Sequence, residues 1–343
     1  MRCTPALIIL AFAASVDATP LDEILNLTPL WRDNAPLCES SPSSANCNDG
    51  DMTLFNGLLC ASGEPLGCDS VKKAQDASGR WHRSPRIAAD SELRDKNTFS
   101  WDMVLGVQLY VVTTKDVEAL NRWLAWIEDH RPCLVESPHL DNVKYCLVRG
   151  WPRWCTVDTD EKGCTAKPQH FATLIRTIDK MGAVLPKPAE DALPGGLAGV
   201  VLKKLQDEAR EANTTLSLSR LLSLARDLQP AVLLADAGLN RPGFSRHLVG
   251  VEILLARRLG LGSPEVDLAA HIMAIKEKNN PFFQVLYEGP TDRVANMFLA
   301  LAPLDIASLP KNMDDWTWQR EDPETTAKEA NLWDFVFLSG LLK

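Results

Sequence analysis

The sequence predicts an all-α fold: an array of helical hairpins, stapled by disulfides, that forms an incomplete α/α toroid. Segments that are apolar on nearly every side are each followed by a segment with a mixed or amphipathic pattern. Such pairs occur at 52–60 with 69–77, at 101–112 with 115–130, and at 247–257 with 264–278. A helix that is apolar all round must be buried, whereas an amphipathic helix lies over it with one face exposed. This repeated pairing is typical of helical rings and solenoids. No segment alternates with period two, so little β-structure is expected.

The first 18 residues have the composition of an export signal. Arg2 is followed by an apolar run over 6–14 and by a small-residue cleavage site at 16–18. A helix that spans a bilayer needs about 20 apolar residues, and neither this run nor any later one is long enough. We therefore expect an exported protein, secreted or periplasmic, that does not span a membrane. Residues 19–50 are rich in Pro, Ser, Asn and Asp and are expected to form an N-terminal arm.

Cysteine usage agrees with export. The chain has nine cysteines, and removal of Cys3 with the signal leaves an even number. The remaining cysteines fall into neighbouring couples, which suggests the pairing Cys38–Cys47, Cys60–Cys68, Cys133–Cys146 and Cys155–Cys164. Many other connectivities stay open. A zinc site is the alternative, but it needs Cys-x-x-Cys pairs, which the sequence lacks, so structural disulfides are expected.

Length and charge bound the organisation and the partners. A single core usually stops growing at about 250 to 300 residues, and the chain has 343. The Pro- and Gly-rich segment 186–196 is a candidate internal boundary, but the pairing of buried and covering helices continues beyond it, so one helical domain over 51–343 is expected. The net charge of −9 argues against nucleic acid as a partner, because phosphate binding needs a basic surface.

A disulfide-held loop region is expected at 131–166, where Pro and Gly residues interrupt the helical pattern. Helices are expected to resume at 168–181, 197–211, 216–236, 244–259, 264–278, 291–302 and 323–338. Two of these starts are well marked, because Ser263 and Asp322 are capping residues, each followed by a first-turn proline and an early acid.

Two aspartates at the starts of apolar helices are candidates for catalysis. Asp51 precedes the helix that begins at Met52, and Asp102 lies one residue into another helix. A carboxylate at the mouth of a buried helix can act as a general acid or base. The ordinary alternatives are that Asp51 caps its helix, and that Ser100 caps the second helix while Asp102 interacts with its dipole. Asp102 is the sharper candidate, because a charge flanked by large apolar residues is costly unless it is paired or faces water.

A cationic and aromatic loop lies between these two helices. His82 is the third catalytic candidate, and Trp81 and Arg83 are candidates for substrate binding. Arginine binds carboxylate or sulfate through two parallel hydrogen bonds. The alternative is a solvated loop between helices. Further binding candidates, chosen because aromatic faces stack on sugar rings and arginines bind acids, are Trp101, Arg149, Trp151 and Trp154.

His247 and Tyr287 are binding candidates from the other side of a cleft. His247 begins an apolar helix that also carries Glu252, and Tyr287 ends a short apolar run after Pro281. The alternative for His247 is a satisfied core or surface histidine.

Several catalytic and metal-binding classes are not expected. The sequence has no Gly-x-Ser-x-Gly, His-Glu-x-x-His or P-loop motif, and its six histidines are scattered. No cofactor is expected. The alternative is calcium, bound by the oxygen donors of Asn46, Asn48, Asp49 and Asp51, although these residues miss the EF-hand spacing.

With paired buried and covering helices, acidic helix starts and surrounding tryptophans, residues 50–340 resemble the α/α-toroid carbohydrate-active enzymes, the glycoside hydrolases and polysaccharide lyases. The resemblance is architectural, and no family motif matches. It implies an active cleft at the end of the ring where inner helices begin, which is the kind of position that Asp51 and Asp102 occupy. A secreted enzyme that degrades an acidic polysaccharide is therefore expected.

Two chemistries and one other class of protein stay open. As a hydrolase, the protein would divide the acid and base roles between Asp102 and Asp51. As a lyase, it would use His82 or Tyr110 to remove a proton while an arginine neutralises a uronate carboxylate. The alternative is a non-catalytic helical protein that binds a glycan, a peptide or a partner protein.

Overall fold

The computed structural model describes residues 18–36, 50–94, 97–137, 144–156, 161–188, 196–303 and 332–343. These ranges are mostly helical, as predicted, with one two-stranded sheet. The elements of the first half are α1 (Pro20–Asn34), α2 (Met52–Ala61), α3 (Pro65–Lys73), α4 (Pro85–Ala89), α5 (Ser91–Arg94), α6 (Trp101–Thr114), α7 (Val117–Asp129), β1 (Cys133–Glu136) and β2 (Cys146–Arg149). Those of the second half are α8 (Glu161–Cys164), α9 (Pro168–Met181), α10 (Gly196–Thr215), α11 (Leu218–Ala225), α12 (Gln229–Leu239), α13 (Phe244–Arg258), α14 (Pro264–Lys276), α15 (Pro281–Glu288), α16 (Asp292–Leu299) and α18 (Leu332–Leu341). Within the described ranges, no helix has both the length and the apolarity to cross a bilayer.

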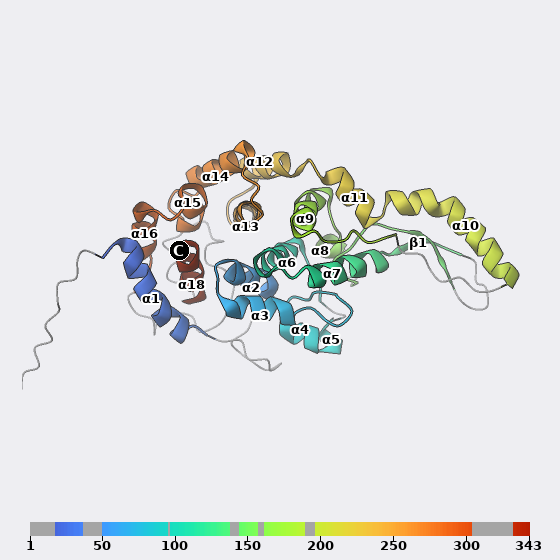
Figure 1. Cartoon of the computed structure of the whole chain (residues 1–343), viewed down its shortest axis with the longest axis horizontal. Coiled ribbons are helices and arrows are strands. Elements are labelled where there is room, and N and C mark those ends of the chain that lie inside the picture. The colour runs from blue at the N-terminus through green and yellow to red at the C-terminus, as the bar shows by residue number, and fades with distance from the viewer. Residues whose placement is uncertain are drawn as a thin grey trace, which may run out of the picture.

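α6 lies at the centre of the array and packs against α2, α3, α7, α9 and α13. In Figure 1, α2, α3, α4 and α5 lie along the lower side of the molecule and α6 and α7 in its middle, and an arc from α16 through α14 and α12 runs along the upper side to α10 at the right-hand end. α2 is buried along its whole length, and α6 is buried from Asp102 to Val112. The buried helices predicted at 52–60 and 101–112 are thus confirmed.

α2 and α6 cross with their backbones in contact. A Cβ atom added to Gly57 would lie 2.3 Å from the carbonyl oxygen of Gly106, and one added to Gly106 would lie 2.2 Å from that of Thr53. Only glycine allows so close an approach of two backbones. Because the two helices bury each other and are covered on their remaining sides, both need apolar side chains all round.

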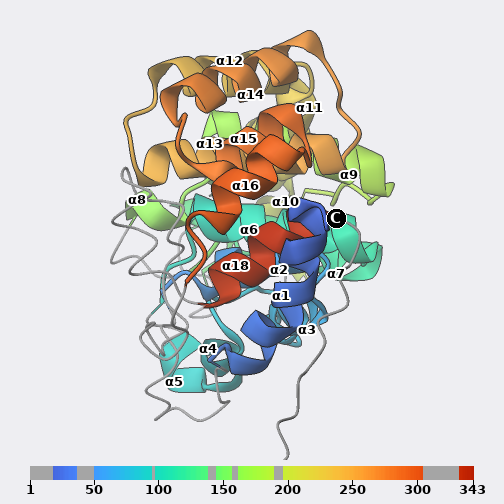
Figure 2. The ribbon, with the colours of Figure 1, turned by 90° about the vertical axis from the view of Figure 1, so that its left-hand side faces the viewer.

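Within the segment predicted as an arm, residues 20–34 form helix α1, which packs against the rest of the described chain. The hydroxyl of Thr19 accepts a hydrogen bond from the backbone N–H of Asp22 at 3.2 Å, and the Asp22 carboxylate accepts from the Thr19 N–H at 3.0 Å, so the helix begins with a capping box. Trp31 is buried, with ring centroids 5.6 Å from Phe298 and 5.5 Å from Phe335. Figures 1 and 2 show α1 beside α18, so the first and last described helices pack together.

Three of the predicted disulfides are confirmed, and they close short loops between neighbouring segments. They are Cys60–Cys68, Cys133–Cys146 and Cys155–Cys164. The first joins α2 to α3, and the second joins β1 to β2. The fourth predicted pair, Cys38–Cys47, lies outside the described residues, as does the expected export signal.

The region predicted as a loop at 131–166 contains a β-hairpin. β1 and β2 pair in antiparallel fashion, with Cys133 opposite Arg149 and with two register shifts along the ladder. The strands read Cys-Leu-Val-Glu and Cys-Leu-Val-Arg, without the alternation of apolar and polar residues that identifies a strand in a sequence.

The single helix expected at 216–236 is divided into α11 and α12, with a break at 226–228. Pro230 lies in the first turn of α12. Proline has no backbone N–H and its ring clashes with the carbonyl four residues earlier, so a continuous helix is disfavoured there. The expected helix start at Asp322 lies outside the described residues.

Candidate functional site

A cavity of about 310 Å³ lies where the start of α6 meets α9, α12 and α13. Three carboxylates line it, Asp102 of α6, Asp236 of α12 and Glu252 of α13, together with the rings of Trp101 and His170. The other polar residues of its wall are Ser100, Lys167, Gln169, Asn240 and Ser245. We call this cavity the carboxylate cleft, because acids from three separate helices face it.

Glu252 lies on the buried side of α13 and is 8% exposed. Its Oε1 accepts a hydrogen bond from the indole Nε1 of Trp101 at 3.1 Å. Burial raises the pKa of Glu252 to about 7, the negative charge of Asp236 adds to this rise, and the hydrogen bond from Trp101 opposes it. Burial also raises the pKa of Asp236. A carboxyl group that titrates near neutral pH can act as a general acid under physiological conditions.

Asp102 lies in the first turn of α6 and is 6% exposed. The partial positive charge at the start of a helix favours a carboxylate at this position. Ser100 does not cap the helix through its side chain; its Oγ accepts a hydrogen bond from Arg83 Nη2 at 3.3 Å. Ser100 therefore occupies the N-cap position of α6, as predicted, but without a side-chain capping hydrogen bond. Asp102 combines a favourable helix dipole with a place in the wall of the cleft.

Trp101 and His170 form a parallel stack in the cleft. Their ring centroids are 4.2 Å apart and their planes differ by 1°. Burial, helped by the charge of Lys167, lowers the pKa of His170 to about 3, so its imidazole is neutral at physiological pH. Its Nδ1 accepts a hydrogen bond from the backbone N–H of Lys167 at 3.1 Å. The neutral ring therefore carries its proton on Nε2.

Arg83 ties the starts of α2 and α6 together. It donates to Asp51 Oδ1 at 3.2 Å, to the carbonyl of Thr98 at 2.8 Å and to Ser100 Oγ at 3.3 Å. Asp51 does not cap α2 through its side chain, and it is not part of the wall of the carboxylate cleft. The carboxylates that join Asp102 in the cleft are Glu252 and Asp236, whereas Asp51 and Arg83 connect the starts of α2 and α6.

Trp81, His82 and Trp154 lie in the core rather than in the cleft. The rings of Trp81 and Trp154 are fully buried, each with its centroid 5.6 Å from that of Trp123. His82 is also buried, with its Nε2 2.8 Å from Oδ2 of Asp76. This corrects the expectation that the two tryptophans stack on a ligand, because neither has an exposed ring face.

Four further candidates lie away from the carboxylate cleft. Trp151 is half-buried and donates its indole N–H to the carbonyl of Ala166. Arg149 is on β2, and Tyr287 is 43% exposed at the end of α15. His247 is fully buried, and burial lowers its pKa to about 3. Neither of its ring nitrogens has a hydrogen-bond partner in the described part of the chain, so it is a core histidine, though not a satisfied one.

The residues considered for calcium are not assembled into a site by the described structure. Asn46, Asn48 and Asp49 lie outside the described residues, and Asp51 is bound to Arg83. Among the residues with described positions, no group of three or more His, Cys, Asp or Glu side chains is arranged to hold a metal ion.

The titratable residues Glu252, His170 and Asp236 of the cleft were not assigned a site role from the sequence, although Glu252 was noted on the helix that begins at His247. Glu252 carries the same signal as Asp102, a charge within an apolar helix, and this signal could have found it. His170 lies in the first turn of a predicted helix, and Asp236 lies near the end of another, with no local feature that distinguishes either from a surface residue. The chain matches no protein-family model, and comparisons with curated proteins and with solved structures find no similar protein.

Proposed function

We propose that the protein hydrolyses glycosidic bonds in the carboxylate cleft, with Glu252 as the general acid and Asp102 as the base. One observation carries the proposal: a buried glutamate that titrates near neutral pH faces the same cavity as an aspartate stabilised by a helix dipole. A carboxyl group whose pKa lies near 7 can donate a proton at physiological pH, and a second carboxyl group on the same cavity can serve as the base, which is the pair that glycoside hydrolysis requires.

In this mechanism, protonated Glu252 gives its proton to the glycosidic oxygen as the bond from that oxygen to the anomeric carbon breaks. Asp102 removes a proton from the water whose oxygen bonds to the anomeric carbon. A closer approach of the two carboxyl groups would instead let Asp102 attack the carbon directly, and the configuration of the product distinguishes these routes. The sugar would contact the Trp101 ring and the hydroxyl and amide groups of the cleft wall.

The geometry supports hydrolysis better than elimination. The candidate bases for a lyase have other partners: His82 is buried against Asp76, and the hydroxyl of Tyr110 donates to Asp116 at 2.6 Å. Burial and that hydrogen bond raise the pKa of Tyr110 well above its ordinary value, so it is a poor base near neutral pH. Neither side chain lines the carboxylate cleft.

The α/α ring forms part of the same proposal. The packing of α1 against α18 and α16, and of α18 against α2, brings the two ends of the helical array together. The carboxylate cleft lies at the start of the buried helix α6. Both features fit an incomplete ring with its active cleft at the mouth of an inner helix.

The test measures turnover on a panel of neutral and acidic polysaccharides. New reducing ends report any cleavage, and near-ultraviolet absorbance reports the unsaturated sugars that a lyase would form. Glu252→Gln and Asp102→Asn should each lower kcat/KM by about a hundredfold or more, without unsaturated products. Glu208→Gln, which changes an exposed glutamate of α10, serves as the matched control and should retain activity. If no polysaccharide is cleaved while one is bound tightly, the protein is a glycan-binding protein and the hydrolase proposal is wrong.

A further inference from the structure

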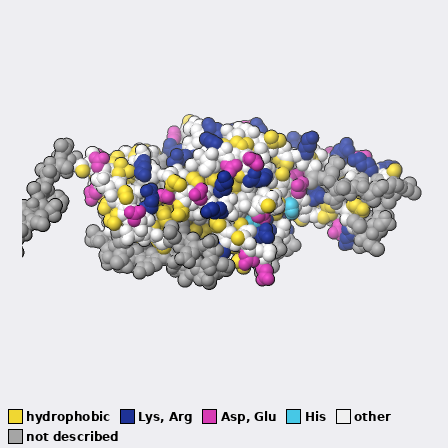
Figure 3. All heavy atoms as spheres, turned by 60° about the horizontal axis from the view of Figure 1, so that its bottom comes forward, with side chains coloured by type: hydrophobic (Ala, Val, Ile, Leu, Met, Phe, Trp, Pro, Cys, Tyr) yellow, Lys and Arg dark blue, Asp and Glu magenta, His cyan; other side chains and the backbone are white. Residues whose placement is uncertain are grey.

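A second cavity, of about 460 Å³, lies between β2, the segment after α9 and the helix α10. Its wall holds four cationic side chains and one acid: Arg149, Lys187, Lys203, Arg210 and Asp207. We call it the basic hollow. The whole chain has a net charge of −9, whereas four of the five charged residues that line this cavity are cationic. Figure 3 shows Lys and Arg side chains along the end of the molecule that carries α10.

The one acid of the wall pairs with two of its cations. Asp207 lies 2.7 Å from Nη2 of Arg210 and 3.5 Å from Nζ of Lys203, so one carboxylate is shared between two cations. Exposed ion pairs of this kind are weak and are screened by salt. A ligand with several oxyanion groups can therefore compete for these cations.

The cations of α10 lie on one face of the helix. Lys203, Asp207 and Arg210 are spaced four and three residues apart, which places their side chains one above the other. The remaining polar lining supplies neutral hydrogen-bonding groups and consists of Gln206, Asn213 and Thr214. The hollow thus combines charges that bind acidic groups with amides and a hydroxyl that suit the hydroxyls of a sugar.

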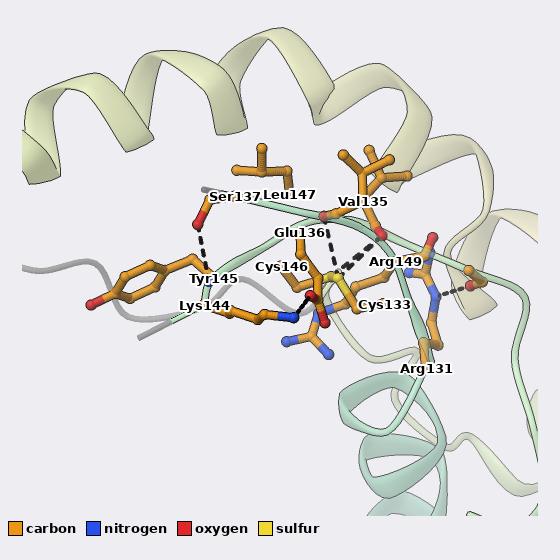
Figure 4. Close-up of a disulfide and its surroundings, with 12 residues drawn as sticks. Arg131, Cys133, Val135, Glu136, Ser137, Lys144, Tyr145, Cys146, Leu147 and Arg149 are labelled. Atoms are coloured by element: carbon orange, nitrogen blue, oxygen red, sulfur yellow. Dashed lines mark hydrogen bonds and ion pairs between the residues drawn. A yellow bond between two sulfur atoms is a disulfide. The ribbon is translucent and has the colours of Figure 1, made fainter. Parts of the chain in front are cut away.

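The two walls of the hollow are held at a set separation. The side chain of Asn213 bridges them: its Oδ1 accepts from the backbone N–H of Arg149 at 2.8 Å, and its Nδ2 donates to the carbonyl of Leu147 at 2.8 Å. Figure 4 shows the hairpin and its Cys133–Cys146 disulfide beside α10, with Leu147 directed toward the helix. A site whose walls are already in place loses less entropy when a ligand binds.

We propose that the basic hollow binds an acidic oligosaccharide through its carboxylate or sulfate groups. The volume falls in the range of small-ligand sites, about 300 to 1,000 Å³. The proposal deepens the proposed function, on which the choice of a sugar as the ligand rests. The basic hollow, and not the carboxylate cleft, would give the protein a preference for acidic glycans.

The test is isothermal titration calorimetry on the full chain with the Glu252→Gln substitution, so that binding is measured without turnover. The probes are an oligogalacturonate, a sulfated heparin-derived oligosaccharide, a neutral malto-oligosaccharide of equal length, and tripolyphosphate as a polyanion that is not a sugar. At least one acidic sugar should bind, and more weakly at higher salt, whereas the neutral sugar and tripolyphosphate should not bind comparably. Adding Lys203→Gln and Arg210→Gln together should weaken binding by about tenfold or more. Lys204→Gln, which removes an exposed charge from the same helix outside the hollow, should change it by less than about twofold.

The proposal fails if neither acidic sugar binds, if the double variant binds as tightly as its parent, or if tripolyphosphate binds as well as the acidic sugars. These failures are distinct from failure of the hydrolase. If acidic sugars bind through Lys203 and Arg210 but the unsubstituted chain cleaves no polysaccharide, binding at the basic hollow is supported and the hydrolase proposal is contradicted. If cleavage depends on Glu252 but neither acidic sugar binds, the hydrolase proposal is supported and binding at the basic hollow is contradicted.

Discussion

The indole nitrogen of Trp101 donates a hydrogen bond at 3.1 Å to the carboxylate of Glu252, a residue 151 positions later in the chain. This bond joins the start of α6 to α13 and lowers the pKa that burial alone would give Glu252. Trp101, the candidate for sugar contact, is therefore bonded directly to Glu252, the candidate general acid.

Trp101→Phe is expected to move the alkaline limb of the kcat/KM profile to higher pH. Phenylalanine keeps an aromatic ring but cannot donate a hydrogen bond, so burial raises the pKa of Glu252 without opposition. Carbon-13 NMR titration of the Glu252 carboxyl measures the same change without activity. Trp151→Phe is the control, since that indole donates to Ala166 away from the cleft, and an equal displacement in both variants would contradict the role of the Trp101 bond.

Glu252→Gln is expected to stabilise the fold above neutral pH. Burial raises the pKa of Glu252 from 4.5 to about 7, so the folded state binds this proton more tightly than the unfolded state does. The free energy of unfolding therefore falls as pH rises from about 4.5 to 7, by roughly 3 kcal/mol from this group. Denaturant unfolding at pH 8 should show a gain of that order in the variant, and little gain at pH 4.5. A gain that is the same at both pH values would rule out charge burial as its cause.

Gly106→Ala is expected to disrupt the crossing of α2 and α6. The new Cβ would lie 2.2 Å from the Thr53 carbonyl oxygen, and overpacking of this kind costs about 1 to 3 kcal/mol or more. Gly238→Ala in α12 is the control, because a Cβ there meets nothing within 4 Å and alanine favours a helix by up to about 1 kcal/mol. Thermal unfolding should show a lower Tm for the first variant and an equal or higher Tm for the second. Equal Tm losses in both would mean that the close crossing is not what requires Gly106.

Glu128→Gln is expected to lower the free energy of unfolding by about 3 to 5 kcal/mol, the usual effect of removing one partner from a buried ion pair. Glu128 and Arg131 are almost fully buried, and Glu128 Oε2 also accepts from the N–H of Leu218 at 2.7 Å at the start of α11. The pair Glu118–Arg122 is exposed, so Glu118→Gln should cost less than about 1 kcal/mol. Urea unfolding with the disulfides intact measures both values, and a loss below about 1 kcal/mol for Glu128→Gln would show that the buried pair is not a major contributor.

Much of the helical architecture could be predicted because the distribution of apolar residues along a helix reflects which of its sides are buried. α2 and α6 are buried on nearly all sides and their sequences are mostly apolar, whereas α7 has one buried apolar face and one exposed polar face. The three described disulfides join cysteines 8 to 13 positions apart, so neighbouring couples sufficed to pair them. The hairpin was missed because its strands do not alternate between apolar and polar residues.

The candidate site was only partly predictable. Asp102 was found because a charge next to large apolar residues at a helix start is unusual, and Trp101 because aromatic faces stack on sugar rings. Trp81 and Trp154 were misjudged as ligand contacts, because a tryptophan in a loop sequence looks the same whether its ring is buried or exposed. Asp51 could be paired with Asp102 only by analogy between two helix starts.

By itself, the sequence determined that the chain is mainly helical, that α2 and α6 are buried, that three neighbouring cysteine couples pair, and that Asp102 needs a special environment. Only the tertiary structure decided that Glu252, and not Asp51, shares a cleft with Asp102, and that Arg83 takes up the Asp51 carboxylate. The physical reason is the range of the interactions. Periodicity and capping act over a few residues of one helix, whereas the protonation of Glu252 depends on burial and on side chains from α6 and α12 that only the packing of the helices brings near it.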